Sequence, residues 1–193
     1  MIAPRPAVRE PLAIRAHPLV FALVLFLASE LMFFASLFAA YYDLRAIDGA
    51  AWPPPGTALD AGPATFATLL LALSSVTVYL AARQFDRGAA RVRAWLLATA
   101  LLGALFLVVA VRGWARANFS ISTSAYGSMF FTMTGFHALH VLAGIVLLIG
   151  LTIGLRKPAF AADHRAGAEA IMFYWHFVFV VWVGLWATIY FVR

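Results

Sequence analysis

Five ionisable side chains lie within or beside long apolar runs, where charge is costly. They are Glu30, His137, His140, Glu169 and His176. A charged residue inside a membrane-spanning helix costs on the order of 2.5–3.5 kcal/mol on insertion scales, so such residues usually have a role. We expect each of these groups either to form hydrogen bonds between helices or to handle protons.

Glu30 lies in the middle of the first apolar run, in the sequence Leu-Ala-Ser-Glu-Leu-Met-Phe-Phe. Removal from water disfavours the charged carboxylate, whereas hydrogen-bond donors on a neighbouring helix would stabilise it. Two interpretations therefore stay open for Glu30. It is either a structural strut that fixes helix packing or a group that binds and releases a proton.

The histidines allow several kinds of chemistry. His137 and His140 are three residues apart, which places them on one helical face, and His176 follows Glu169 by seven residues on another helix. Haem ligation by His140 and His176 is one alternative, and a carboxylate–histidine metal site is another. A di-iron bundle would use Glu-x-x-His on two helices, and the sequence has no such motif. Hydrogen bonding across helices or to a partner chain is the favoured interpretation, with no metal bound.

A second group of residues suits packing or lipid contact. Hydroxyls such as Ser74 and Ser75 can bond within their helix or to a neighbour. Tryptophans near the ends of apolar runs are typical of the membrane interface, and we expect most of them to be anchors. Trp52 and Trp175 are assigned to packing or lipid contact. Trp182 is also assigned to packing or lipid contact. Three glycines in one run permit close backbone approach: Gly127, Gly135 and Gly144.

Composition indicates the elements that hold these residues. The chain has 193 residues, of which 64% are hydrophobic and 11% charged, and its mean hydropathy is +0.91. Soluble domains are about half apolar and about a quarter charged, so a membrane protein is indicated. With no cysteine, disulfides and thiolate chemistry are excluded. The net charge of +6 lies at the ends of the apolar runs, which indicates membrane topology rather than nucleic-acid binding.

Five apolar runs are long enough to span a bilayer, which takes about 20 residues. They cover residues 19–41, 64–82, 94–111, 126–155 and 170–192. Backbone groups in lipid must bond within their own segment, so each run should be a helix. The predicted fold is an all-α integral membrane bundle, with an N-terminal segment at residues 1–18 and a five-helix domain at residues 19–193.

The distribution of basic residues predicts the orientation. If the N-terminus is inside, ten of the 14 lysines and arginines lie on the inner side and four on the outer side. Cytoplasmic loops carry the excess of such residues. We therefore expect a cytoplasmic N-terminus and a C-terminus outside.

Five motifs, in order along the chain, resemble those of cytochrome c oxidase subunit III. Residues 29–34 are similar to the family's Ser-Glu-x-x-Phe-Phe helix, and residues 52–56 to its Trp-Pro-Pro-x-Gly loop. Residues 126–141 are similar to its Tyr-Gly-Ser-x-Phe-Phe and Thr-Gly-Phe-His-x-Leu-His-Val motifs. Residues 169–190 resemble its closing helix and the Glu-Ala pair before it. The resemblance covers nearly everything from Phe21 to Phe191.

This resemblance implies a subunit with no catalytic centre, haem or copper of its own. Such a subunit packs against the catalytic haem–copper subunit I, works with subunit II and other respiratory subunits, and binds phospholipid. It sustains proton uptake and enzyme lifetime. The chain lacks the first two of seven helices, like the short bacterial forms, which implies a bacterial inner membrane. Glu30 is then the buried carboxylate of the family. His137, His140, Glu169 and His176 are the family's polar core positions.

Two positions depart from the family pattern. Phe179 replaces an Asp in the closing helix, and Thr123 stands where an acidic residue often precedes Tyr-Gly-Ser. Because of these two changes, the alternative function is that of an accessory third subunit of a quinol oxidase or nitric oxide reductase. A stand-alone haem-binding or transport protein is the alternative from another class.

Overall fold

The chain forms five long helices with short connections. The computed structural model describes residues 18–85, 88–156 and 165–192. The helices are α1 (Pro18–Asp48), α2 (Ala61–Arg83), α3 (Ala89–Arg116), α4 (Ala125–Gly154) and α6 (Arg165–Tyr190), and a short 3-10 helix, η1 (Gly49–Ala51), follows α1. All five long helices are long and apolar enough to cross a membrane, and no strand occurs in these described ranges. The predicted all-α bundle with five spans is confirmed.

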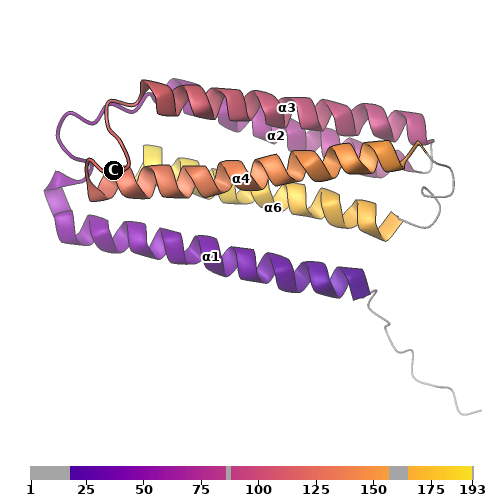
Figure 1. Cartoon of the computed structure of the whole chain (residues 1–193), viewed down its shortest axis with the longest axis horizontal. Helices are drawn as coiled ribbons and strands as arrows, with labels where there is room; N and C mark the ends of the chain where they lie inside the picture. The colour runs from indigo at the N-terminus through magenta and orange to yellow at the C-terminus, as the bar shows by residue number, and fades with distance from the viewer. Residues whose placement is uncertain (1–17, 86–87, 157–164, 193) are drawn as a thin grey trace, which may run out of the picture.

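Four helices make the body of the bundle, and α1 packs on one side of it. Helices α2 and α3 form a close pair above α4 and α6, while α1 lies below and packs mainly on α4 and α6 (Figure 1). The most apolar part of α1 is only 11% buried, against 28–44% in the other four helices. Helix α1 is therefore the helix that depends most on specific contacts or on surroundings outside this chain.

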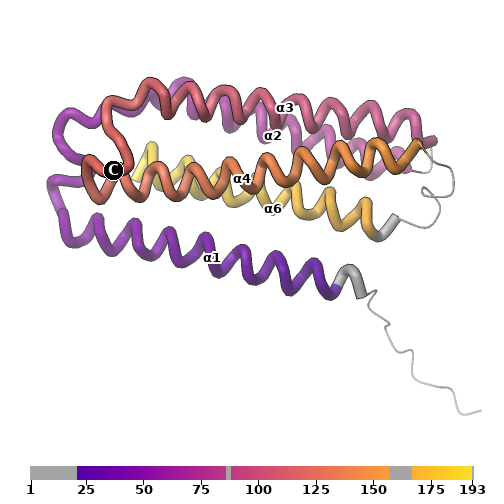
Figure 2. Tube along the Cα trace, viewed as in Figure 1, coloured from indigo at the N-terminus to yellow at the C-terminus, as the bar shows by residue number. Residues whose placement is uncertain are grey.

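The connections gather at the two ends of the bundle. The trace shows η1, the start of α2, the α3–α4 connection and the C-terminal end of α6 at one end, and the start of α1 at the other (Figure 2). The segments that the sequence places outside thus share one end. Which end faces the cytoplasm stays a prediction, and residues 1–17 of the expected cytoplasmic segment lie outside the described residues.

Trp175 lies inside the bundle, where its ring packs between helices. Its side chain is 1% exposed and fills a slot between Gly103 of α3 and Gly144 of α4. A Cβ atom would lie 2.6 Å from the indole ring if added at Gly103, and 2.8 Å from it if added at Gly144. The indole N–H donates to the Ser74 hydroxyl at 2.9 Å. These two glycines therefore provide the space that lets α6 enter the bundle.

Hydroxyl groups of α2 bond to its neighbours. The Trp182 indole N–H donates to Thr68 at 2.9 Å, one heptad along α6 from the bond between Trp175 and Ser74. Ser75 is also buried, but its hydroxyl has no hydrogen-bond partner among the described residues. Trp52 is buried in protein, with its ring centroid 5.1 Å from those of Tyr41 and Tyr126.

Most helices extend beyond the apolar runs that identify them. Helix α1 continues to Asp48 rather than ending near residue 41, and α3 covers residues 89–116 rather than 94–111. Helix α2 begins at Ala61, where the Asp60 carboxylate accepts a hydrogen bond from the Gly62 N–H at 2.9 Å. Helix α6 begins at Arg165 and ends at Tyr190, not at residues 170 and 192. Hydropathy marks the hydrocarbon crossing, whereas helical hydrogen bonding continues into the interface, where polar side chains are tolerated.

Candidate functional site

Glu30 of α1 and His140 of α4 form a hydrogen-bonding contact across the bundle. The Glu30 Oε2 atom lies 2.7 Å from the His140 Nε2 atom. The two residues are 110 positions apart in the sequence. Their side chains are 21% and 16% exposed respectively, so the pair lies in the seam between the two helices and not deep in the core.

The helical spacing of α1 explains why Glu30 faces α4. Leu27 and Phe34 are buried residues of α1, and they lie one heptad apart with Glu30 between them. Residues at i, i+3 and i+7 share one face of a helix. The packing of Leu27 and Phe34 against the bundle therefore turns the Glu30 carboxyl toward His140.

The hydrogen bonds of His140 determine how many protons the pair holds. His140 Nδ1 lies 2.7 Å from the Phe136 carbonyl oxygen. A carbonyl oxygen only accepts, so Nδ1 carries a hydrogen. A carboxylate oxygen and a bare ring nitrogen would both be acceptors, so the 2.7 Å contact with Glu30 requires one more hydrogen between them.

This shared hydrogen gives the pair zero net charge. If it resides on Glu30, both groups are neutral; if it resides on His140, a carboxylate faces an imidazolium. Adding or removing a proton would leave one net charge in a membrane-spanning segment, which is costly. The 2.7 Å contact is therefore a hydrogen bond in which the carboxyl and imidazole groups share one hydrogen.

A third helix supports His140. The Tyr174 hydroxyl of α6 donates to the His140 backbone carbonyl at 3.0 Å. The Phe34 ring lies edge-on to the imidazole of His140, with 5.1 Å between the ring centroids. Sequence reasoning missed Tyr174, because a tyrosine in an aromatic-rich apolar run gives no sign of which carbonyl it will reach. The pair therefore lies where α1, α4 and α6 meet.

His137 belongs to a separate environment, although it is only three residues from His140. Its side chain is 1% exposed, and its ring lies 5.6 Å from Phe106 of α3 and 5.1 Å from Trp182 of α6. Neither ring nitrogen has a hydrogen-bond partner among the described residues. A three-residue step turns a helix by about 60°. This turn is enough to direct His140 to the α1 seam and His137 into the core.

Glu169 and His176 lie on α6 away from this pair. Glu169 is exposed near the start of the helix, and His176 is partly buried. In the parts of the chain that the structure describes, no hydrogen bond or ion pair joins His176 to Glu30 or His140, and no group of three potential metal ligands occurs. Haem ligation by His140 would require loss of its contact with Glu30 or with Phe136, because both ring nitrogens are engaged.

The two positions that depart from the family pattern have ordinary structural roles. Phe179 is partly buried and packs against the hydrophobic core. The Thr123 hydroxyl oxygen accepts from the Ser120 N–H at 2.9 Å and closes the turn before α4. Neither replacement leaves an evident gap in the fold.

Comparison with known proteins gives one consistent family. The family model described as cytochrome c oxidase subunit III matches residues 12–193. The chain is 42% identical to a probable cytochrome c oxidase subunit 3 of Nocardia farcinica over 176 residues, which is 88% of this chain and 86% of that protein. It is 41% identical to the cytochrome c oxidase subunit 3 of Corynebacterium diphtheriae, again over 88% of this chain and 86% of that protein. The Rattus norvegicus subunit 3 is 38% identical over 88% of this chain and 68% of its own length.

Proposed function

This chain belongs to the cytochrome c oxidase subunit III family, and we propose that it is the non-redox third subunit of a haem–copper terminal oxidase in a bacterial cell membrane. Its partners would be the catalytic subunit I, subunit II and membrane phospholipids, with haem and copper held by the partner subunits. The chain would support assembly, lipid binding and proton uptake in aerobic respiratory electron transport. Membership of the family and the five apolar helices support this assignment.

The contact between Glu30 and His140 is the observation that carries a specific role. Helix α1 buries little of its own surface, and besides this pair a 3.2 Å contact between the Tyr42 and Thr188 hydroxyls links it to α6. A polar contact in a membrane contributes roughly 0.6 kcal/mol on average and up to about 1.7 kcal/mol. We propose that the Glu30–His140 pair is a strut that holds α1 on the bundle, so that the surface offered to the catalytic subunit persists during turnover.

A matched pair of substitutions separates the strut from a proton-transfer role. Glu30→Gln replaces the carboxyl with an amide that can donate a hydrogen bond to His140 Nε2 but cannot exchange protons. Glu30→Ala removes the contact altogether. Both variants would be made in the tagged chain of the complete oxidase, and oxygen consumption would be followed from the first turnovers through prolonged activity.

The strut predicts normal initial rates for both variants, with a shortened active lifetime for Glu30→Ala and near-normal lifetime for Glu30→Gln. If Glu30→Gln slows the initial rate as much as Glu30→Ala does, the pair handles protons and the strut proposal is wrong. Equal lifetimes for both variants and the unmodified chain would refute the strut, and normal initial rates in both variants would refute the proton-transfer role.

Affinity purification of the tagged chain in mild detergent tests the wider assignment. We expect a large haem–copper subunit to co-elute and a redox difference spectrum typical of an oxidase. A chain that elutes alone, after a control for dissociation in detergent, would contradict membership of a stable oxidase. A haem spectrum from the isolated chain would contradict its non-redox role.

A further inference from the structure

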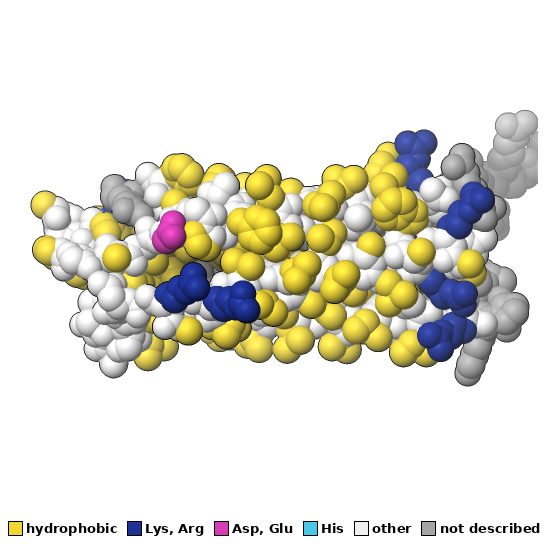
Figure 3. All heavy atoms as spheres, turned by 90° about the horizontal axis from the view of Figure 1, so that it is seen from above, with side chains coloured by type: hydrophobic (Ala, Val, Ile, Leu, Met, Phe, Trp, Pro, Cys, Tyr) yellow, Lys and Arg dark blue, Asp and Glu magenta, His cyan; other side chains and the backbone are white. Residues whose placement is uncertain are grey.

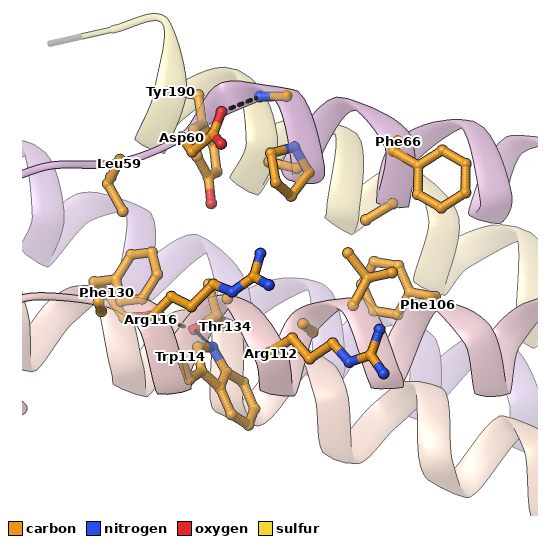
Figure 4. Close-up of a pocket in the computed structure, with 18 of the residues that line it drawn as sticks. Leu59, Asp60, Phe66, Phe106, Arg112, Trp114, Arg116, Phe130, Thr134 and Tyr190 are labelled. Atoms are coloured by element: carbon orange, nitrogen blue, oxygen red, sulfur yellow. Dashed lines mark hydrogen bonds between the residues drawn. The ribbon is translucent and has the colours of Figure 1, made fainter.

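A cavity of about 620 Å³ opens between α2 and α3, away from the Glu30–His140 seam. It lies where the start of α2 faces the end of α3, and residues of α4 and α6 also line it (Figure 4). The space-filling view shows basic and acidic side chains near one end of this face, beside a hollow with apolar walls (Figure 3). Small-molecule sites have volumes of roughly 300–1,000 Å³, so one elongated ligand group fits.

The cavity wall combines two cations with apolar surface. Arg112 and Arg116, one turn apart on α3, line it, and no described residue forms a salt bridge with either. Figure 4 shows Asp60 across the space at the start of α2, with its carboxylate bonded to the backbone N–H of Gly62. The walls include the aromatic rings of Phe66, Phe106 and Trp182. With both arginines and Asp60 ionised, the charged lining has a net charge of +1.

The depth of these groups matches that of a lipid headgroup. Arg112 immediately follows the apolar run that ends at residue 111. Trp114, whose indole N–H donates to Thr134 at 3.1 Å, lies between the two arginines in sequence. Tryptophan and arginine at the end of a spanning segment are typical of the membrane interface. The aromatic walls extend from there into the bundle, along the direction that an acyl chain takes.

We propose that this cavity binds one anionic glycerophospholipid, with its phosphate on Arg112 and Arg116 and one acyl chain against the aromatic wall. The proposal deepens the lipid binding that is part of the proposed function by naming the site and the headgroup charge. Guanidinium groups bind phosphate oxygens through charge-assisted hydrogen bonds. A protein helix could fill the apolar part, but its side chains would have to supply the negative charge that a lipid phosphate brings with it.

The test measures binding of 1-palmitoyl-2-oleoyl-phosphatidylglycerol to the delipidated full chain by native mass spectrometry, with the matching phosphatidylcholine as reference. Arg112→Gln/Arg116→Gln is compared with Arg91→Gln/Arg93→Gln, which removes two cations from the opposite end of α3. About 1 kcal/mol for each basic residue near a lipid surface predicts roughly 30-fold weaker binding of the tightest phosphatidylglycerol in the first variant. The control variant should retain it.

A third variant tests the charge balance. Asp60→Asn removes a negative charge from the wall while leaving a residue that caps helices well. We expect it to tighten phosphatidylglycerol binding about fivefold and to leave phosphatidylcholine binding unchanged. Circular dichroism of each variant verifies that the bundle is intact.

Three results would overturn the proposal. They are equal binding of the two lipids by the unmodified chain, unchanged phosphatidylglycerol binding in Arg112→Gln/Arg116→Gln, and equal loss in the control. The chain has no native cysteine, so a photoreactive label on Ala110→Cys reports what fills the cavity in the assembled complex. Cross-linking to a protein subunit instead of lipid would also refute the site. Because the lipid titration uses the full chain alone, its failure is distinct from failure to co-elute with an oxidase.

Discussion

At the scale of single residues, the bundle combines a neutral polar pair in a seam with a tryptophan in a slot. Glu30 and His140 satisfy one another through one hydrogen, so the site brings no net charge into the membrane. Trp175 is a different case, because its large ring is accommodated only where two other helices present glycine. Both arrangements depend on partners from distant parts of the sequence, and each can be disrupted by one substitution.

The Trp175 slot gives a direct prediction about packing. Gly144→Ala would place a methyl group against the indole ring, and overpacking of this kind costs about 1–3 kcal/mol. Gly150→Ala, on the same helix, meets no atom within 4 Å and removes a residue that weakens helices. We expect only Gly144→Ala to lower the unfolding free energy in reversible SDS titrations. Equal stability of the two variants would show that the slot relaxes freely.

Sequence alone identified the ionisable residues of the candidate site but not their arrangement. A glutamate and histidines in apolar runs are conspicuous because charge in lipid is costly. The pairing of Glu30 with His140, and not with His137, depends on the rotation and register of α1 against α4. No local pattern specifies that register. For the same reason the sequence does not show how Trp175 packs, since its burial depends on glycines in two other helices.

At the scale of elements, the side chain of Asn118, in the α3–α4 connection, bonds to the connection between α1 and α2. The Asn118 side-chain amide donates to the Gly56 carbonyl at 2.7 Å, and its carbonyl oxygen accepts from the Ala58 N–H at 3.3 Å. The first bonded pair is separated by 62 residues. Asn118 therefore joins the proline-rich segment before α2 to the end of α3, close to the arginine-lined cavity.

Loss of this bridge should loosen the proline-rich segment without unfolding the bundle. Each hydrogen bond contributes about 0.5–1.5 kcal/mol, so Asn118→Ala should speed amide exchange at Ala58 roughly fivefold or more. Hydrogen–deuterium exchange of peptides covering residues 53–60 measures this. Ser122→Ala is the matched control, because Ser122 bonds to Ser120 within its own turn. Similar exchange in both variants would contradict the bridging role.

The sequence predicts element types better than element ends. Five apolar runs of sufficient length identify five spans, since a bilayer requires about 20 apolar residues for each helix. The ends differ because polar flanks such as residues 89–93 and 112–116 continue the helix outside the hydrocarbon. At α2, Gly62 and Pro63 suggest a linker, yet both lie in the first turn of the helix, where proline is tolerated.

At the scale of the whole molecule, orientation is the property that the fold leaves open. Among the described residues, the end of the bundle where α1 begins carries Arg83, Arg91, Arg93 and Arg156. The opposite end, where α6 ends, carries Arg45, Arg112 and Arg116. Much of the excess of basic residues on the predicted cytoplasmic side comes from the N-terminal segment and from the segment between α4 and α6. The arginine-lined cavity is at the end with fewer cations, so the predicted orientation places the proposed lipid in the outer leaflet.

Cysteine labelling determines this orientation directly, because the native chain has no cysteine. Ser122 lies in the α3–α4 connection and Ala90 at the start of α3, and both are exposed at opposite ends of the bundle. An excess of basic residues marks cytoplasmic loops, so Ser122→Cys should react with a membrane-impermeant maleimide in intact cells. Ala90→Cys should react only after permeabilisation. The reverse pattern would place the C-terminus inside and the arginine-lined cavity in the inner leaflet, where anionic lipid also attracts basic side chains.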